Sequence, residues 1–475
     1  MTSPAAHPFA DHPFVTEACS LQAQGGVFAG NVPVYVARAP GRLDLMGGND
    51  DYTGGMVFES TIREATWAAA QVRSDRTIVL CNPQMAEQGW QARVEFDLSE
   101  LNDASHVRSL VNRDPAVRWT AYVAGVFHWL QQEFPTQANC GMTVLLRSEV
   151  PLNKGVSSSA AVEVATMKVA AKAYSVDLSG VQLAEACQWV ENVIAESACG
   201  IMDQIAVVLG DEGCVLPLVC QSCLPQPLVR LPQGLTCWGI DSGVRHEVSG
   251  VEYEAARAAA FMGYKLLCDR EGIPVEFDAA STIPRWSDSR WQGYLANLPL
   301  STYRTLEAHL PETLSDDEYL KLGKVHVDPF TKLRPEVVYH VRACTRYAVE
   351  ENLRVRLFAE LARGMSDGFT PSGAELLGEL MYQSHEAYTE TGLGSGKTDL
   401  LVQLAREEGP EHGIFGAKIT AGGGGGTVAV LGRVDAEDAF GRIVERYRRA
   451  TGIEAYVFRG SSIGADRFGV LELNA

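Results

Sequence analysis

A predicted helix that opens on three consecutive serines is the feature that most constrains how this chain folds. In residues 151–173, PLNKGVSSSAAVEVATMKVAAKA, a proline and a flexible Asn-Lys-Gly turn precede the serines, and good helix formers follow them. Because alternating apolar residues at 142–146 come just before, the pattern predicts strand, loop and helix in that order. Unpaired N–H groups and the positive end of the helix dipole then face the loop and favour an anion. The alternative is an ordinary serine N-cap on a core helix.

Two glycine-rich stretches also indicate a binding site. Residues 39–55, APGRLDLMGGNDDYTGG, follow an alternating strand at 32–38 and place charged side chains among five glycines. Residues 417–431, AKITAGGGGGTVAVL, set five consecutive glycines between two apolar strands. Because such a run costs backbone entropy at every residue, we expect another group to approach the backbone closely there.

These three stretches, in this order, resemble the three signature motifs of the GHMP small-molecule kinases. The second motif of that superfamily is Pro-x-x-x-Gly-Leu-x-Ser-Ser-Ala. Its counterparts here are Pro151, Gly155, Ser158, Ser159 and Ala160, with Val156 in place of the leucine. The resemblance implies a fold of class α+β (mixed α/β), the two-lobed GHMP kinase fold, with the active site in the cleft between the lobes.

Further segments narrow the resemblance to the galactokinase branch. They are APGR with Asp51-Tyr52, Trp119 and Tyr122, CGIMDQ at 199–204, and DSGVRH at 241–246. Within that branch, GRLDLMGG, KGVSSSAAVEVA, WGIDSGVRH, AFMG, GELMYQSH and GLGSGKTD are most similar to the kinase half of the L-arabinokinases. The resemblance runs from about residue 31 to residue 473.

The length predicts more than one core. At 475 residues we expect two lobes after a lead-in at 1–30. A change of composition near residues 225–234 separates an N-terminal lobe at 31–225 from a C-terminal lobe at 235–475. The polar, proline-broken segment around 272–335 is expected to be an insertion of short helices.

Charge and composition exclude several classes of function. A net charge of -19 argues against a nucleic-acid partner, because phosphates would be repelled. No apolar run has the length of a membrane span and the first residues do not read as a secretory signal, so we expect a cytoplasmic protein without a membrane partner. Eleven scattered cysteines indicate reduced thiols, and the isolated pair Cys220 and Cys223 is too little for a zinc site.

Phosphoryl transfer requires a positioned nucleophile and neutralised charge. Asp203 lies in the turn at 200–204 without a neighbouring carboxylate, and the resemblance implies that it is the catalytic Asp, acting as a base or orienting the sugar hydroxyl. Arg42 follows Pro-Gly at the end of a strand, and the resemblance implies that it contacts the transferring phosphoryl group and Asp203. A helix cap for Asp203 and a salt bridge from Arg42 to Asp44 or Asp51 are the alternatives.

The resemblance implies that ATP and Mg²⁺ are cofactors. The expected ATP-binding residues are Lys154, Gly155, Val156, Ser157, Ser158, Ser159 and Ala160, and the expected loop of the third motif is Gly422, Gly423, Gly424 and Gly425. Because Mg²⁺ prefers few, hard oxygen ligands, Glu191 and one of the serines, Ser158, are the expected metal ligands. Glu191 as a solvated charge on a helix is the alternative. Residues 394–398, GSGKT, look like the end of a Walker A loop, but Thr391 stands where its first glycine belongs, so no second nucleotide site is expected.

On the sugar side, the resemblance assigns Asp51 to two ring hydroxyls and places Tyr253 near the ring, with Gly200 and Asp203 completing the pocket. The galactokinase pattern Gly-Glu-His-x-Asp-Tyr, however, reads GGNDDY at residues 47–52. Gly48 and Asn49 thus replace the Glu and His that meet the 6-hydroxyl of a hexose. We therefore expect a pentose, and we expect that restoring Glu and His would favour galactose.

The leading hypothesis is an ATP-dependent sugar kinase that phosphorylates the anomeric hydroxyl of L-arabinose. A galactokinase acting on D-galactose is the first alternative, and a non-catalytic sugar sensor built on a kinase fold is the second. Arg42, Glu191 and Asp203 are all present, which argues against a sensor because a sensor need not keep all three.

Overall fold

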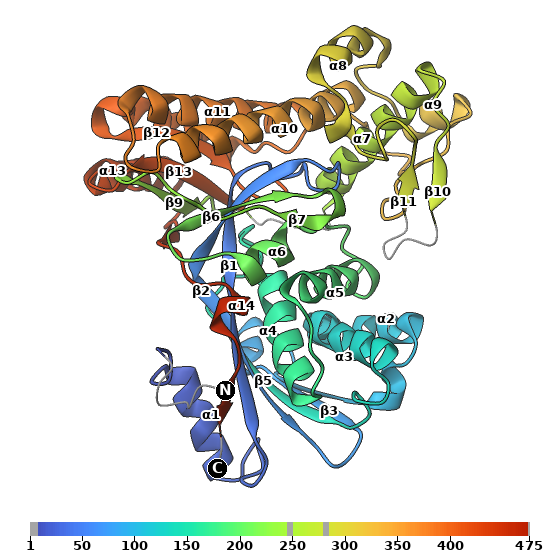
Figure 1. Ribbon diagram of the computed structural model, residues 1–475, viewed down its shortest axis with the longest axis vertical. Helices are drawn as coiled ribbons and strands as arrows, with labels where there is room; N and C mark the ends of the chain where they lie inside the picture. Colours follow the sequence, from blue (N-terminus) through green and yellow to red (C-terminus); the bar gives the residue numbers. More distant parts are fainter. Residues whose placement is uncertain (1–7, 245–249, 279–284, 474–475) are drawn as a thin grey trace.

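The computed structural model describes residues 8–244, 250–278 and 285–473 and has two lobes, each built on one main sheet (Figure 1). Arg245 and His246 of the expected DSGVRH segment lie outside the described residues. In the part of the chain that the structure describes, none of the helices combines the length and the apolar character needed to cross a membrane.

Two long antiparallel strands form the centre of the first sheet. The first half of β2 pairs with β6 and its second half with β5, while β1 lies along its other side. One long strand thus joins both ends of the sheet. The strands are β1 (Val34–Met46), β2 (Met56–Val72), β3 (Thr77–Cys81), β4 (Arg93–Asp97), β5 (Met142–Ser148), β6 (Cys214–Val219), β7 (Leu224–Pro225), β8 (Val229–Arg230) and β15 (Leu471–Leu473).

The two faces of the first sheet pack against different helices. On β2, Ala68 and Ala70 belong to the large core beneath α3, α4 and α5, whereas Trp67 and Ala69 belong to a smaller core beneath α1. This alternation is the period of two that a strand imposes on its side chains. The helices of this lobe are α1 (Pro13–Ala23), α2 (Ala104–Asn112), α3 (Ala121–Glu133), α4 (Ser158–Ala173), α5 (Gly180–Val193), α6 (Met202–Leu209) and α14 (Ala465–Phe468).

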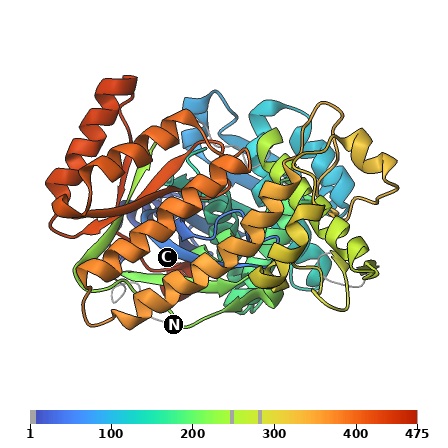
Figure 2. The same cartoon turned by 90° about the horizontal axis from the view of Figure 1, so that it is seen from above.

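The second sheet is also covered on both faces. Val428 and Val430 pack against α12 and α13, whereas Ala429 and Leu431 pack against α10 and α11. The long helices α10 and α11 run side by side across this lobe in Figure 2. The sheet order is β12 (Ile414–Ile419), β13 (Thr427–Arg433), β9 (Leu235–Asp241) and β14 (Val457–Arg459), and the helices are α10 (Val341–Gly364), α11 (Pro371–Glu390), α12 (Gly396–Glu408) and α13 (Glu437–Thr451).

A shared core joins the two lobes. Leu43 and Phe58 of the first sheet pack in one cluster with Phe358, Phe415 and Leu431 of the second lobe. Because apolar side chains from both lobes are buried together, the strand ends between them have a fixed geometry.

The expected insertion lies at one end of the second lobe, at the upper right of Figure 1. It contains the expected short helices α8 (Leu300–Leu306) and α9 (Asp316–Lys321). It also contains a hairpin that the sequence did not predict, β10 (Glu276–Asp278) with β11 (Arg285–Ser287). The insertion follows α7 (Val251–Arg270).

Three local expectations were wrong. The strand expected at 32–38 continues to Met46, so Arg42 lies inside β1, next to an irregularity in register between Pro40 and Arg42. A register irregularity is one of the few places where a strand interior tolerates a proline. Asp203 lies in the first turn of α6, not in a tight turn, and α12 was not expected at all.

The last strand belongs to the first sheet. Val34 pairs with Leu473 and Val36 with Leu471, so β15 extends the sheet beside β1. The end of the segment expected as the C-terminal lobe therefore packs with the N-terminal lobe.

Candidate active site

Arg42 and Asp203 form a buried ion pair between the first and second motifs. Arg42 Nη2 and Nε donate to Asp203 Oδ1 over 2.7 and 3.0 Å, and Nη1 donates to the carbonyl oxygen of Gly155 at 2.8 Å. The side chain of Arg42 is 2% exposed and that of Asp203 is 16% exposed. Burial alone lowers the pKa of Arg42, but Asp203, Glu59 and Asp44 together raise it above its ordinary value. The structure thus brings together the two predicted catalytic residues, whose roles stay predictions.

The serine-rich loop contacts Arg42 through the backbone of Gly155 and Val156. Ser157 is the N-cap of α4 with a φ of 59°, and Ser158 is the first helical residue. The backbone N–H of Arg42 donates to the carbonyl oxygen of Val156 at 3.1 Å. Ser157 Oγ is buried and has no hydrogen-bond partner among the described residues. An orphaned hydroxyl beside the unpaired N–H groups of a helix start is suited to an anionic ligand.

The rest of the expected ATP-binding loop forms hydrogen bonds with the second lobe. Lys154 Nζ donates to Asp241 Oδ2 at 2.5 Å, and Thr427 Oγ1 donates to the carbonyl oxygen of Lys154 at 2.8 Å. Gly155 has a φ of 69°, which disfavours a side chain at this position. Ser159 is half-buried and Ala160 is buried in the first turn of α4.

The glycine run connects β12 to β13 close to this loop. Gly423, Gly424 and Gly425 have positive φ, and Gly422 is buried at the start of the run. The N–H of Gly424 donates to the carbonyl oxygen of Leu393 at 2.7 Å. Since β13 begins with Thr427, which contacts Lys154, the second and third motifs are neighbours.

Glu191 lies on α5 in a buried cluster of carboxyl groups beside Asp203. Gln204 Nε2 donates to Glu191 Oε2 at 2.8 Å. Burial, and then Asp203, raise the pKa of Glu191 to about 7, while hydrogen bonds from Ser159 and Gln204 lower it. Burial also raises the pKa of the neighbouring Glu163 well above its ordinary value. Ser159 contacts Glu191, whereas Ser158, the expected partner, is half-buried at the start of α4.

The described residues contain no group of three or more His, Cys, Asp or Glu side chains that could hold a metal ion. A divalent cation at Glu191 would therefore depend on serine, water and phosphate oxygens. Mg²⁺ sites commonly have this composition.

Asp51 lines the cavity at the expected sugar site. Its carboxylate accepts from the N–H of Tyr52 at 2.9 Å and from the N–H of Met202 at 3.5 Å. A Cβ at Gly200 would overlap the Asp51 carboxylate, so only glycine fits there. Burial, and then Asp203, raise the pKa of Asp51 to about 6, while the charge of Arg257 lowers it.

Next to Asp51 and Gly200 there is a cavity of about 360 Å³, large enough for a monosaccharide. Its opposite wall comes from the insertion and includes Trp286, Tyr294 and Phe330. Tyr253 is buried nearby and packs edge-on against Tyr52, with ring centroids 6.0 Å apart.

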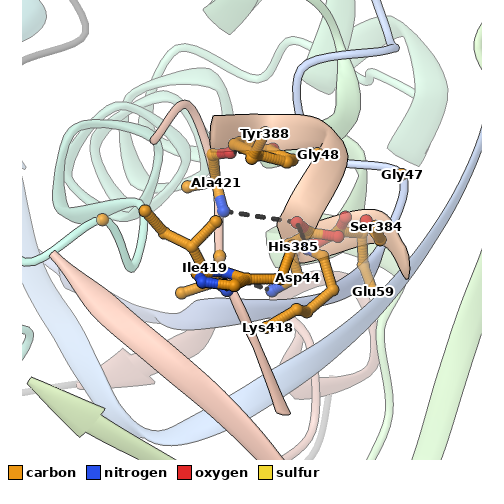
Figure 3. A network of polar contacts seen from close by, with 12 residues as sticks. Asp44, Gly47, Gly48, Glu59, Ser384, His385, Tyr388, Lys418, Ile419 and Ala421 are labelled. Carbon is orange, nitrogen blue, oxygen red and sulfur yellow. Dashed lines mark hydrogen bonds and ion pairs between the residues drawn. The ribbon is translucent and has the colours of Figure 1, made fainter. Parts of the chain in front are cut away.

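Gly48 faces a buried polar network (Figure 3). A Cβ at Gly48 would overlap the Asp44 carboxylate and the Tyr388 hydroxyl, and the Gly48 carbonyl accepts from the Tyr347 hydroxyl. Asn49 Oδ1 accepts from the Tyr52 hydroxyl at 2.7 Å. A side chain at position 48 would require Asp44, Tyr388 or the backbone at Ala421 to move, and the effect of restoring Glu and His on the sugar preference stays a prediction.

Several polar residues near the site were missed by the sequence analysis. Asp44 and Lys418 form a fully buried ion pair at 2.8 Å between the lobes, and Glu59 approaches Arg42. Arg257 pairs with Asp328 of the insertion. The residue types alone gave no signal, because these contacts depend on strand register and on the packing of distant segments.

This chain is similar in sequence to several known proteins. Residues 121–211 match the family profile described as GHMP kinases N terminal domain, and residues 27–72 match the Galactokinase galactose-binding signature. The chain is 34% identical to the L-arabinokinase of Arabidopsis thaliana over 95% of this chain and 48% of the plant protein, so it spans about half of that relative. It is 29% identical to the galactokinase of Chloroflexus aggregans over 87% of each chain.

Solved structures show the same fold. The structure of Lactococcus lactis galactokinase complexed with galactose has a TM-score of 0.73 at 19% identity and covers 97% of this chain and 100% of that one. Mevalonate kinase from Methanococcus jannaschii has a TM-score of 0.55 at 14% identity, covering 90% of this chain and 98% of that one. The chain thus contains a match to the GHMP kinase N-terminal domain and a match to the galactokinase galactose-binding signature, and it is similar in sequence to an L-arabinokinase and to galactokinases.

Proposed function

We propose that this chain is an ATP-dependent sugar 1-kinase that transfers the γ-phosphoryl group of ATP to the anomeric hydroxyl of L-arabinose. The main support is the Arg42–Asp203 pair: Arg42 donates to Gly155 in the loop before the serine-rich helix, and Asp203 follows Met202, whose N–H donates to Asp51 in the wall of the cavity. The L-arabinokinase relative supports the choice of sugar.

In this proposal Asp203 accepts the proton of the anomeric hydroxyl or orients that hydroxyl. Both hydrogen bonds from Arg42 go to Oδ1, so we assign Oδ2 to the sugar hydroxyl, as base or as orienting group. The sugar oxygen bonds to the γ-phosphorus as the bond to the ADP oxygen breaks. The permanent charge of Arg42 stabilises the negative charge on the transferring group, and the N–H groups at the start of α4 bind phosphate oxygens.

We infer that Glu191 and one serine, Ser158 or Ser159, hold Mg²⁺. Their oxygen atoms fit a hard cation, and the orphaned Ser157 Oγ lies at the same helix start. Ser159 is the stronger candidate because it already contacts Glu191. Mg²⁺ bound there would neutralise phosphate charge.

The sugar preference rests on Gly48 and Asn49. L-arabinopyranose matches D-galactopyranose from C1 to C4 but lacks the hydroxymethyl group. Gly48 offers no side chain, and the Asn49 amide oxygen already accepts from Tyr52. A hexose would bury a poorly paired hydroxyl at a cost of about 1–3 kcal/mol, roughly ten- to a hundredfold in kcat/KM.

An assay of ADP release over a panel of free monosaccharides tests both parts of this proposal. We expect kcat/KM for L-arabinose to exceed that for D-galactose by about tenfold or more, with a 1-phosphate as the product in ³¹P NMR. Asp203→Asn should remove the sugar-dependent signal. Absence of sugar-dependent ADP release from the wild-type protein would overturn the kinase proposal.

D-galactose is the second candidate substrate. The match to the galactose-binding signature at residues 27–72 and the galactokinase relatives favour it. A preference for galactose of tenfold or more in the same assay would select this alternative.

A further inference from the structure

Glu59 lies on the strand next to Arg42 and is one of the groups that contact it. Its Cα pairs with that of Asp44 across β1 and β2, so the two side chains are cross-strand neighbours on one face of the sheet. Glu59 Oε2 is 3.4 Å from Arg42 Nε, and the Glu59 side chain is fully buried. Glu59 therefore contacts the same edge of the guanidinium group that Asp203 binds.

Three carboxyl oxygens at this place accept no hydrogen bond from the described residues. Both oxygens of Glu59 and Oδ1 of Asp44 are buried without a hydrogen bond to any residue in the described part of the chain. Two adjacent buried carboxylates repel each other, and unpaired buried acceptors are costly. A proton on one of the two groups would turn one free acceptor into a donor for another.

The surrounding charges indicate which group holds that proton. The charged groups that face Glu59 are Arg42 and Asp44 from β1, Asp203 from α6 and Lys418 from β12. These are two cations and two carboxylates, so they balance without Glu59. Burial, and then Asp44, raise the pKa of Glu59 well above its ordinary value, although Arg42 and Lys418 lower it.

The second lobe binds one oxygen of Asp44 (Figure 3). Asp44 Oδ2 accepts from Lys418 Nζ at 2.8 Å and from the N–H of Ala421 at 3.3 Å. The N–H of Asp44 donates to Thr420 Oγ1 at 2.9 Å. With Oδ2 used by the second lobe, Oδ1 is left for Glu59.

We propose that Glu59 is a positioning residue for Arg42 that acts as a neutral carboxylic acid, donating its O–H from Oε1 to Asp44 Oδ1 and keeping Oε2 in electrostatic contact with Arg42 Nε, 3.4 Å away. Arg42 is then held from the sheet by Glu59 and from the cleft by Asp203. Because Asp44 is bound to Lys418, the orientation of Arg42 depends on the seating of the second lobe. The kinetic part of this inference rests on the proposed sugar kinase activity.

Two substitutions of similar size separate this role from simple packing. Glu59→Met removes both hydrogen-bonding atoms, whereas Glu59→Gln keeps a neutral donor and an acceptor. We expect Glu59→Met to lower kcat about ten- to a hundredfold with KM for ATP and sugar changed less than about threefold, because Arg42 is misplaced. Glu59→Gln should restore kcat to within about threefold of the wild-type value.

Glu408→Met is the matched control. Glu408 is a buried carboxylate on α12 that pairs with Arg442 at 2.7 Å, away from Arg42. Its loss should lower stability and leave kcat unchanged. A Glu59→Gln variant as impaired as Glu59→Met, or a fully active Glu59→Met variant, would overturn the proposal.

An infrared measurement tests the protonation state without any activity. The difference spectrum of wild-type protein minus Glu59→Gln, at neutral pH in D₂O, should contain the C=O stretch of a protonated carboxylic acid. A carboxylate band in its place would overturn the proposal even if Glu59→Met failed to fold. A wild-type protein inactive on every sugar would remove the proposed function and leave this test intact.

Discussion

Two buried arginine–aspartate pairs in this molecule differ in how many oxygens of the carboxylate accept hydrogen bonds from the arginine. Between α7 and the insertion, Arg257 Nε and Nη2 donate to the two different oxygens of Asp328 at 2.8 and 3.0 Å, and Thr331 Oγ1 adds a further bond at 2.7 Å. In the cleft, both donors of Arg42 go to one oxygen of Asp203. The Asp328 side chain is fully buried, whereas that of Asp203 is 16% exposed.

The difference separates stability from chemistry. A carboxylate whose two oxygens are both paired inside the protein has little capacity left for a ligand, and breaking such a pair leaves a buried charge alone. A carboxylate with one engaged oxygen keeps its second oxygen for a substrate. We therefore expect Asp328 to hold the insertion in place and Asp203 to take part in the reaction.

The largest expected effect concerns Asp203. Asp203→Asn is nearly isosteric, and we expect it to lower kcat by roughly 10² to 10⁴ because the positioned proton acceptor is lost. ATP affinity should stay close to the wild-type value, as measured by calorimetry. A variant that keeps more than half of the wild-type turnover would remove Asp203 from the reaction.

Asp328→Asn should show the opposite pattern. We expect the free energy of unfolding to fall by about 3–5 kcal/mol, because Arg257 loses its charged partner in a buried place. Urea titration at matched m-values gives this number. The control is Asp435→Asn at an exposed pair with Arg433, where a loss below about 1 kcal/mol is expected. If Asp203→Asn costs more stability than Asp328→Asn, the distinction between the two pairs fails.

The smallest expected effect concerns the stability contributed by Asp51, whose pKa depends on one member of each pair, Asp203 and Arg257. Its pKa is about 6 in the folded protein against an ordinary value of 3.8, so the folded state favours the protonated form. The contribution of Asp51 to the free energy of unfolding is therefore fully present below pH 4 and is lost as the pH rises through about 6. A shift of roughly two units corresponds to about 3 kcal/mol.

Asp51→Asn removes this cost along with the sugar contact. We expect the variant to be more stable than the wild-type protein by up to about 3 kcal/mol at pH 8 and by little at pH 4, with sugar binding lost at both. Thermal unfolding at the two pH values is the measurement. Equal stability differences at both pH values would show that Asp51 does not titrate as described.

Much of the fold follows from local pattern. The strand at 93–97 and the start of α4 at Ser158 lie where alternation and the serine cap place them. The proximity of Arg42 and Asp203 followed from the resemblance, because the motif positions are shared by the superfamily.

Other features depend on register and packing between distant segments. The strand containing Arg42 is longer than its alternation suggests because β2 pairs beyond the irregularity at Pro40, and this pairing also makes Asp44 a neighbour of Glu59. Gly48 reads as an open position in the sequence, yet Tyr388 from α11 fills the space beside it. The GSGKT segment resembles part of a nucleotide motif, but its Ser395 is the N-cap of α12.

The return of the chain end to the first sheet has a consequence for synthesis on the ribosome. Arg38 of β1 donates to the carbonyl oxygen of Ile463 and to Ser462 Oγ, and β15 then pairs with the start of β1. This edge of β1 therefore stays unpaired until residues 424 positions further along the sequence have been synthesised. Contacts so distant in sequence form late and slowly. The first lobe thus completes its sheet only after β15 has been synthesised.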